Sequence, residues 1–408
     1  MDLTIRALAP DEHGDFLRTV EAAFGGHPTA EDLAVDRSVF EPERSLGAFV
    51  GSELVGAASS FTFRLTVPGG QAPMAGVTGV GVLPTHRRRG ILTALMGRQL
   101  EDLRERGEAL AGLWASEGGI YGRFGYGVAA HVAAVEIDTA RSAFLREMVS
   151  RSRVRLVDKA EALARMPAVY ERVRVRQPGF LDRPTAAWWN AEFADLESHR
   201  GGAGELFFAV LERNGADAGY VAYRVRHDWQ PAGPDHTIVV QELLGDDPTA
   251  EAALWRYVLD VDLVGRVTAR DRPAHEPLLH LLLEPRRLRL TVRDGLWLRL
   301  VDVPGALQAR RYGAAGVLTI EVDDAFCPWN RGTFELEAGT VGAGACRPTG
   351  RAPDLRLRTE DLAAAFLGGT GFRALARAGR IEETAPGALA RADELFAADP
   401  PPWCPWIF

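Results

Sequence analysis

The spacing of apolar residues in the first third of the chain predicts helices and strands in alternation. Over 11–24 the apolar positions recur every three or four residues, as on one face of a helix. Two β-rich runs then flank a Gly-Ser-Glu turn at 51–53, which indicates a hairpin. The predicted elements are, in order, a helix over 11–24, strands over 46–50, 54–67 and 75–83, a helix over 90–106 and a strand over 109–115. This order is typical of a mixed α/β module.

The same order of elements recurs in the middle of the chain and predicts a second, diverged copy of the module. The predicted elements are strand, turn and strand over 207–226, a strand over 237–244, a helix over 249–260 and a strand near 265–269. The copies differ where strand meets helix: the first has Arg87-Arg88-Arg89-Gly90, and the second has Asp246, Asp247 and Glu251. The first helix start would attract an anion, whereas the carboxylates at the second would repel it.

The last third of the chain has a different pattern, which predicts a small sheet and several short helices. The predicted elements are strands over 288–300, 316–322 and 332–336, and helices over 359–367, 372–377 and 386–397. The final ten residues are rich in proline and cannot be helical. They also carry Trp403, Trp406, Ile407 and Phe408, whereas tails that fray are usually polar or small. We therefore expect the tail to be buried against the rest of the protein, either for stability alone or to serve a site.

Composition narrows the class of protein. The 408 residues are 47% hydrophobic and 25% charged, as expected for globular domains, and no apolar run approaches the ~18 residues of a membrane helix. The acidic N-terminal segment lacks the apolar core of a signal peptide, which favours a cytoplasmic location. A net charge of −8 disfavours a nucleic-acid binder and favours cationic partners. Three cysteines without a CxxC pair predict neither disulfides nor a metal site.

The segment 78–92 carries the clearest candidate chemistry. An apolar strand containing Val80 and Val82 runs into a tight basic loop, and the loop opens a helix. Backbone N–H groups at the helix start and the neighbouring arginines would together bind an anion such as a phosphate. Gly90 would let the anion approach the backbone closely. The alternative is a basic helix start that is merely solvated.

This loop and a second stretch resemble a known enzyme family. Arg87-x-x-Gly90 after a V-x-V strand resembles the acyl-CoA signature of the GCN5-related N-acetyltransferases (GNAT), although Leu92 stands where that family usually has Gly or Ala. The stretch 115–127, Ala-Ser-Glu-Gly-Gly-Ile-Tyr-Gly-Arg-Phe-Gly-Tyr-Gly, closely resembles the Eis (enhanced intracellular survival) acetyltransferases. That resemblance extends over essentially the whole chain.

The resemblance implies an architecture. The fold class would be α/β, with two tandem GNAT-type modules, the second degenerate, followed by an α+β domain similar to sterol carrier proteins. The three parts would cover 1–145, 146–285 and 286–408, with the C-terminus of the last reaching the active site of the first. Family members assemble as homohexamers, dimers of trimers, and this chain is expected to do the same.

The resemblance also implies how acetyl-CoA, the co-substrate, would be held, with no metal. The backbone of Val80 and Val82 would pair with the pantetheine arm, and one of their N–H groups would stabilise the developing oxyanion. The remaining matched residues would hold the pyrophosphate: Arg87, Arg88, Gly90 and Ile91.

Two further residues carry catalytic roles by resemblance. Tyr121 matches the family's general acid, and a phenol with a reference pKa of about 10 has a proton to donate at neutral pH. Tyr126 lies five residues away and is interpreted as a packing residue. The general base would be the terminal carboxylate of Phe408, with a pKa raised by desolvation in the cleft.

The acceptor side departs from the family pattern. The family has one acidic residue shortly after the aromatic that matches Phe24, and another before the last residue; this chain has Gly25-Gly26 and Ile407 there. Carboxylates that could replace them are Glu31, Asp32 and Asp36, which could equally be a solvated helix face.

Three functions follow from these observations. The leading hypothesis is an N-acetyltransferase acting on aminoglycosides at several positions. The alternatives are an acetyltransferase for lysine peptides or other small amines, and a non-catalytic protein that binds CoA or lipid.

Overall fold

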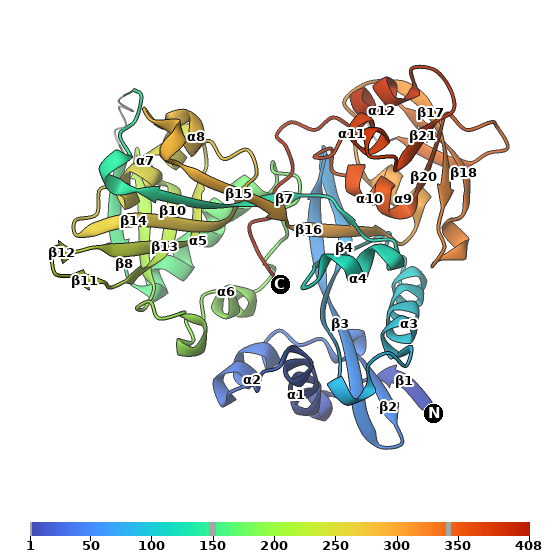
Figure 1. Ribbon diagram of the computed structural model, residues 1–408, viewed down its shortest axis with the longest axis horizontal. Helices are drawn as coiled ribbons and strands as arrows, with labels where there is room; N and C mark the ends of the chain where they lie inside the picture. Colours follow the sequence, from blue (N-terminus) through green and yellow to red (C-terminus); the bar gives the residue numbers. More distant parts are fainter. Residues whose placement is uncertain (1, 147–151, 340–343) are drawn as a thin grey trace.

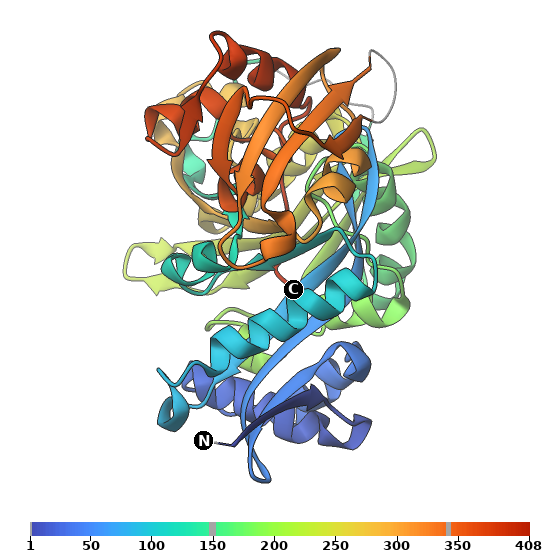
Figure 2. The ribbon, with the colours of Figure 1, turned by 90° about the vertical axis from the view of Figure 1, so that its right-hand side faces the viewer.

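A computed structural model of the chain describes residues 2–146, 152–339 and 344–408. These residues form two seven-stranded sheets, a five-stranded sheet and a small two-stranded ribbon. The two large sheets lie side by side, and the five-stranded sheet packs near one end of the long strands of the first sheet (Figures 1 and 2). No helix in the described ranges is long and apolar enough to cross a membrane.

The first sheet is built from the predicted N-terminal module and one strand from much later in the chain. In sheet order its strands are β1 (Leu3–Ala7), β2 (Leu46–Val50), β3 (Glu53–Val67), β4 (Gly70–Val82), β5 (Leu110–Trp114), β16 (Leu296–Leu300) and β6 (Gly127–Val128). Neighbouring strands are antiparallel except β4 and β5, which are parallel. The predicted hairpin around 51–53 is confirmed, with Val50 opposite Glu53.

Helices α1 (His13–Phe24) and α3 (Ile91–Glu105) cover opposite faces of this sheet. Side chains alternate between the two faces of a strand, so Ala57 packs on the α1 side and its neighbour Ala58 on the α3 side. α1 ends at Gly25, which adopts a φ of 82° and donates its N–H to the Ala22 carbonyl at 3.2 Å. Both helices agree with the sequence prediction.

The second sheet repeats this plan. In sheet order its strands are β15 (Arg289–Asp294), β7 (His131–Asp138), β14 (Val264–Pro273), β13 (His236–Gly245), β10 (Ala216–Arg226), β9 (Phe207–Arg213) and β8 (Ser152–Val157). α5 (Lys159–Arg174) packs on the face that carries Tyr220 and Ala222, and α7 (Pro248–Leu259) packs on the face that carries Val221 and Tyr223. The predicted second copy of the module is therefore present.

The expectation that 288–300 is a strand of the small sheet is wrong. The segment breaks at Gly295 into β15, which joins the second sheet beside β7, and β16, which joins the first sheet between β5 and β6. Hydrophobic alternation identifies a strand but not its neighbours, which are set by tertiary packing. β7 precedes residue 145 but belongs to the second sheet, and β16 follows residue 285 but belongs to the first. The predicted domain boundaries at 145 and 285 therefore remain a prediction.

In the described residues of the C-terminal domain, four helices accompany the five-stranded sheet. In sheet order its strands are β19 (Ala345–Pro348), β18 (Gly332–Ala338), β17 (Gly316–Asp323), β20 (Leu355–Arg358) and β21 (Ile381–Glu383). The helices are α9 (Val303–Ala309), α10 (Thr359–Ala365), α11 (Phe372–Arg377) and α12 (Ala388–Phe396). Its core is continuous with the first sheet, since Phe63, Leu65 and Leu298 belong to the same buried cluster as Phe366 and Phe372.

The tail after α12 is buried between the modules, as the sequence predicts. Trp403 donates its indole N–H to the Asp271 carbonyl at 2.6 Å and its backbone N–H to the Pro178 carbonyl at 2.9 Å. Trp406 is 4% exposed and packs against Phe63 and Trp188. Figure 1 marks the end of the chain between α6 (Ala186–Glu192) and strands β3 and β4.

The contact between the first sheet and α10 generates a stability prediction. A Cβ added at Gly127 would lie 1.9 Å from the Glu360 carbonyl oxygen, part of a helix backbone that cannot move aside locally. We expect Gly127→Ala to lower the free energy of unfolding by about 1–3 kcal/mol, measured as a shift of the urea midpoint.

Gly119→Ala is the matched control for this substitution. Gly119 has no heavy atom within 4 Å of an added Cβ, so the same change there should leave the midpoint unchanged or raise it slightly. Equal midpoints for the two variants would contradict the proposed role of the β6–α10 contact.

Candidate active site

The site begins where β4 and β5 part. The two strands pair at only two positions, Ala75 with Ala111 and Gly76 with Gly112, although β4 runs on to Val82. Beyond Gly76, β4 therefore keeps backbone groups on this side that β5 does not pair. This half-buried strand edge has backbone hydrogen-bond groups that an extended ligand lying along β4 would pair. Gly79, with a φ of 58°, also brings β4 close to the Phe16 ring, where a Cβ would lie 2.7 Å away.

A cavity of about 510 Å³ lies at the end of this opening, between β4 and the start of α3. It is lined by all six residues predicted for the cofactor: Val80, Val82, Arg87, Arg88, Gly90 and Ile91. Gly90 precedes α3 with a φ of 82°, and no side chain caps the first turn of the helix. The N–H groups of that turn are therefore available to an anion.

The loop arginines differ in what they contact. Arg87 donates to the Ala23 carbonyl at 2.5 Å and to the Val82 carbonyl at 3.4 Å, so it ties the loop to the end of α1. Arg88 is exposed and has a positive φ of 61°. Arg88 is therefore the freer of the two cations to move toward a bound anion.

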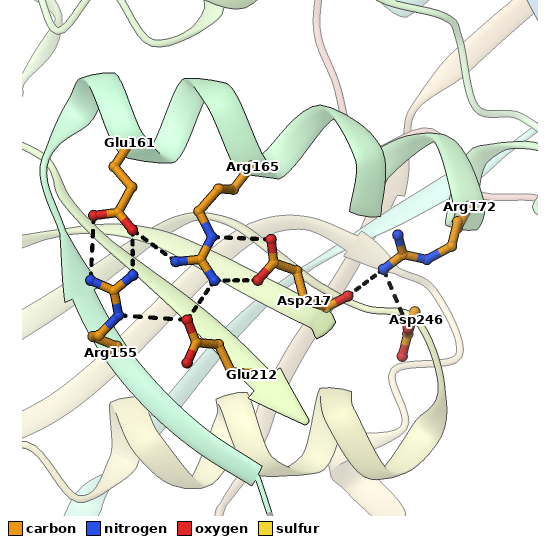
Figure 3. Close-up of polar contacts among 7 residues, drawn as sticks. All are labelled: Arg155, Glu161, Arg165, Arg172, Glu212, Asp217 and Asp246. Atoms are coloured by element: carbon orange, nitrogen blue, oxygen red, sulfur yellow. Dashed lines mark hydrogen bonds and ion pairs between the residues drawn. The ribbon is translucent and has the colours of Figure 1, made fainter. Parts of the chain in front are cut away.

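The corresponding loop of the second module is closed by its own carboxylates. Asp247 caps α7 by accepting the Ala250 N–H at 2.8 Å, and Arg213 pairs with Asp247 at 2.6 Å. Asp246 also pairs with Arg213, at 3.3 Å. Its second partner is Arg172, at 3.4 Å (Figure 3). Glu251 is the third carboxylate that the sequence predicts would repel an anion here, and it pairs with Arg272 instead. The helix start that is uncapped in the first module is thus occupied by a carboxylate in the second.

The same surface of the second module is tied together by a larger ion-pair network. Figure 3 shows it joining α5 to strands β8, β9 and β10 through Arg155, Glu161, Arg165, Glu212 and Asp217. Its carboxylates have their charges matched by arginines from neighbouring elements. The network therefore fixes α5 against the edge of the second sheet.

A second cavity, of about 270 Å³, continues from the first and contains Tyr121 and Phe408. Phe24, Val80, Ser116 and Tyr121 line both cavities, so the two are parts of one cleft. Tyr121 ends the short helix α4 (Gly118–Tyr121) and is 6% exposed. Burial, with a smaller contribution from Glu117, raises the pKa of Tyr121 above its ordinary value. The phenol therefore keeps its proton at neutral pH.

Tyr126 has a different environment. It is completely buried and lies 6.0 Å from the Tyr121 ring, edge to face, but lines neither cavity. Burial raises its pKa far above the ordinary value. These features are those of a packing residue.

The last residue of the sequence reaches into the second cavity. The Phe408 backbone oxygen lies 3.4 Å from the Thr78 hydroxyl, which donates to it. The Phe408 ring packs against Phe63 at 5.2 Å and faces Gly76, where a Cβ would be 3.0 Å from the ring. The two residues predicted to act as acid and base, more than 280 positions apart, thus line the same space.

A third cavity, of about 310 Å³, opens from the second toward the other module. Asp36, Glu21, Thr78 and Phe408 line both cavities. The carboxylates of the third cavity come from three helices: Glu21 on α1, Asp32 and Asp36 on α2 (Ala30–Arg37), and Glu192 on α6.

The residues predicted for the acceptor are not all brought together. Asp32 and Asp36 line the third cavity, whereas Glu31 is exposed and lines none of the three. Phe24 is 58% exposed and lines the first two cavities but not the third. Sequence reasoning missed Glu21, which lies one helical turn before Phe24 and was detectable from that spacing, and Glu192, for which the local sequence carries no signal.

Hydrogen bonds hold two of these carboxylates in place. His13, completely buried, contacts Asp36 through Nε2 at 2.7 Å. Asp32 accepts the backbone N–H and the hydroxyl of Thr29 at 2.8 and 2.7 Å, and lies 3.4 Å from His199 of the second module. Burial opposes ionisation of Asp32, but the Thr29 bonds and His199 outweigh it and lower the pKa.

The chain is similar to known proteins along most of its length. Two acetyltransferase (GNAT) domain models match residues 4–129 and 179–300, and a sterol carrier protein domain model matches 303–405. An uncharacterized N-acetyltransferase of Streptomyces avermitilis is 44% identical over the full length of both chains. N-acetyltransferase Eis of Mycobacterium tuberculosis is 38% identical, covering 87% of this chain and 86% of that protein. The crystal structure of Eis1 from Mycobacterium abscessus superposes with a TM-score of 0.86 at 37% identity, covering 99% of this chain and all of that one.

The difference between the loop before α3 and the loop before α7 predicts opposite effects for one substitution in each. Arg88→Ala should raise the dissociation constant of coenzyme A about tenfold, because a charge-assisted contact to phosphate is lost, and should leave the urea midpoint unchanged. Asp247→Ala should lower the free energy of unfolding by about 1 kcal/mol, because α7 loses its cap, and should leave coenzyme A affinity unchanged.

Calorimetric titration with coenzyme A and urea unfolding of both variants provide the two readouts. The reverse result, with the affinity loss in Asp247→Ala and not in Arg88→Ala, would place the cofactor in the second module.

Proposed function

The chain belongs to the Eis family of GCN5-related N-acetyltransferases, and on that premise we propose that it transfers acetyl groups from acetyl-CoA to the amines of aminoglycosides, at more than one position. The observation that carries the proposal is the single cleft that joins the basic loop, Tyr121, Phe408 and four carboxylates. One end suits a phosphate-bearing cofactor, and the other suits a molecule with several ammonium groups.

The residues of the first module fit acetyl-CoA, which supplies a thioester as the acetyl donor. The unpaired edge of β4 offers the backbone of Val80 and Val82 to the extended arm, and one of these N–H groups would stabilise the negative charge that develops on the carbonyl oxygen. Arg87, Arg88, Gly90 and Ile91 would hold the pyrophosphate at the uncapped start of α3. The described part of the chain shows no group of three or more metal-ligating side chains.

Tyr121 and Phe408 would move the two protons of the reaction. The Phe408 carboxylate would accept a proton from the acceptor ammonium, so that the neutral amine nitrogen can form its bond to the acetyl carbon. As the C–S bond breaks, Tyr121 would donate its phenolic proton to the departing sulfur, which a phenol kept protonated by burial can do. The proton that the acetylated nitrogen then loses would restore the phenol. The Thr78 hydroxyl, bonded to the Phe408 backbone oxygen, would hold the base in the cleft.

The acceptor is proposed from charge and shape. Glu21, Asp32, Asp36 and Glu192 line the third cavity together with the aromatic side chains of Phe61, Trp188 and Trp406. A molecule that has several ammonium groups and apolar ring faces would satisfy both features. The homohexamer, a dimer of trimers, belongs to the same proposal and is tested by sedimentation velocity of the purified chain.

Acetyl transfer itself is tested by release of free thiol from acetyl-CoA with a panel of acceptors. We expect release with several aminoglycosides and products that carry more than one added acetyl mass. Release only with a lysine peptide or a simple diamine would replace the aminoglycoside with that acceptor. No release with any amine, despite coenzyme A binding, would identify a non-catalytic binding protein.

The roles of the acid and the base are tested by two variants. Tyr121→Phe and the addition of two glycines after Phe408 should each lower kcat about 100-fold or more and leave coenzyme A affinity unchanged. Tyr126→Phe is the matched control for the tyrosine and should keep kcat within a few-fold. Full activity in either of the first two variants would show that the corresponding role is assigned to the wrong group.

A further inference from the structure

The segment that carries Tyr121 is a short turn over residues 121–126. Within it the Gly125 N–H donates to the Gly122 carbonyl at 2.9 Å, and the Tyr126 N–H donates to the Tyr121 carbonyl at 3.3 Å. Gly125 has a φ of 81°, a backbone conformation that glycine adopts far more readily than other residues. Short segments of this kind open easily unless tertiary contacts hold them. The place of the Tyr121 phenol in the cleft therefore depends on what packs against the turn.

Arg299 packs against this turn from the first sheet. It lies on β16, the strand that comes from the last third of the chain, and it is completely buried. A Cβ added at Gly125 would be 2.6 Å from the guanidinium carbon of Arg299. The guanidinium thus occupies the space that a side chain at Gly125 would need, in direct contact with the backbone of the turn.

Asp324 of the C-terminal domain fixes that guanidinium. Its carboxylate pairs with Arg299 at 2.5 Å and is the only ion-pair partner that the described residues give this arginine. The same carboxylate accepts the Cys327 N–H at 2.8 Å, the Phe326 N–H at 3.2 Å and the Asn330 side-chain amide at 3.1 Å. All of these donors lie in the loop between β17 and β18. Because a buried ion pair is firm only when other hydrogen bonds hold its members, this loop determines where the guanidinium lies.

The β17–β18 loop also contacts the turn directly. The Phe326 ring packs edge to face against the Phe124 ring, with 4.9 Å between their centres. Phe124 is 1% exposed and shares a buried cluster with Tyr121 and Cys327. The turn is therefore held by this loop in two ways, by an apolar contact and by a polar one through Arg299.

We propose that three residues outside the cleft position the general acid, by holding the 121–126 turn and with it the Tyr121 phenol. These positioning residues are Arg299, Asp324 and Phe326. The inference rests on the proposed function, because it takes Tyr121 as the general acid. It gives the C-terminal domain a part in catalysis through the β17–β18 loop, separate from the part of its tail. A general acid must lie within hydrogen-bond reach of the departing sulfur, so a small displacement of the phenol slows the chemical step.

Two variants weaken the hold on the turn in different ways. Phe326→Leu removes the aromatic contact and no charge, and it should lower kcat about fivefold. Arg299→Met combined with Asp324→Asn removes both charges of the buried pair, so that neither is left unpaired, and should lower kcat about tenfold or more. Both should keep the dissociation constant of coenzyme A within about twofold, because the basic loop before α3 is untouched.

The Tyr121→Phe background separates positioning of the phenol from a general loss of structure. If Phe326 acts through the phenol, Phe326→Leu should cause no further loss of kcat once the hydroxyl is absent. The same fivefold loss in both backgrounds would show that Phe326 acts on another part of the site, and the inference would be overturned.

Hydrogen–deuterium exchange measures the hold on the turn without reference to activity. The amide hydrogens of Gly125 and Tyr126 are bonded within the turn, so a peptide that covers 121–126 should exchange about tenfold faster in both variants than in the natural chain. Peptides that cover α5 in the second module should exchange equally in all three proteins. Unchanged exchange at 121–126 would contradict the inference.

Glu335→Gln is the matched control, because it removes a buried carboxylate of the same domain whose partners are the exposed arginines Arg347 and Arg351. It should match the natural chain in kcat and in exchange at the turn. If the natural chain releases no thiol from acetyl-CoA with any amine, the proposed function fails. Faster exchange at 121–126 in the two variants would then still support the hold on the turn.

Discussion

The parting of β4 from β5 after two paired residues is the constraint on which the rest of the structure depends. It leaves one side of a half-buried strand with polar backbone groups that β5 does not pair and that another extended chain can pair. The opening provides the floor of the cleft, and it brings the uncapped start of α3 and the end of α1 to its two sides. β5 is then stabilised on its other edge by β16, which comes from almost 200 residues later in the chain.

The three parts of the chain are joined by strands that one part contributes to the sheet of another and by a shared core. β7 leaves the first module for the second sheet, β16 returns to the first sheet, and the C-terminal domain shares a buried core with both β3 and β16. The tail then passes between the modules and ends beside Thr78 on β4. An N-acetyltransferase cleft built in this way has walls from all three parts, so the relative positions of the modules set its shape.

The two modules show how one fold is used for different purposes. Each places a helix start at the end of a strand, but Gly90 leaves it open in the first module and Asp247 fills it in the second. A carboxylate already bonded to the helix start repels a phosphate at that place. The second module instead contributes packing surface and the side chains that face the first, among them Arg183, Glu192 and His199.

The sequence by itself determined the features that depend on local pattern: α1, α3, the hairpin of β2 and β3, the repeat of the module, and the basic loop before α3. Short-range sterics and hydrogen bonds set these features, so a window of residues contains the information. The sequence did not predict the helix α5, because Pro167 lies inside it and proline is disfavoured in the interior of a helix. Only the tertiary structure decided that 288–300 divides between two sheets, that Glu31 lies outside the cleft, and that Glu192 joins Asp36 and Phe408 around one cavity. Those outcomes depend on contacts between residues far apart in the sequence. Hydrophobic burial drives such contacts, and because it is non-directional, the sequence near a residue does not show which distant residue it will contact.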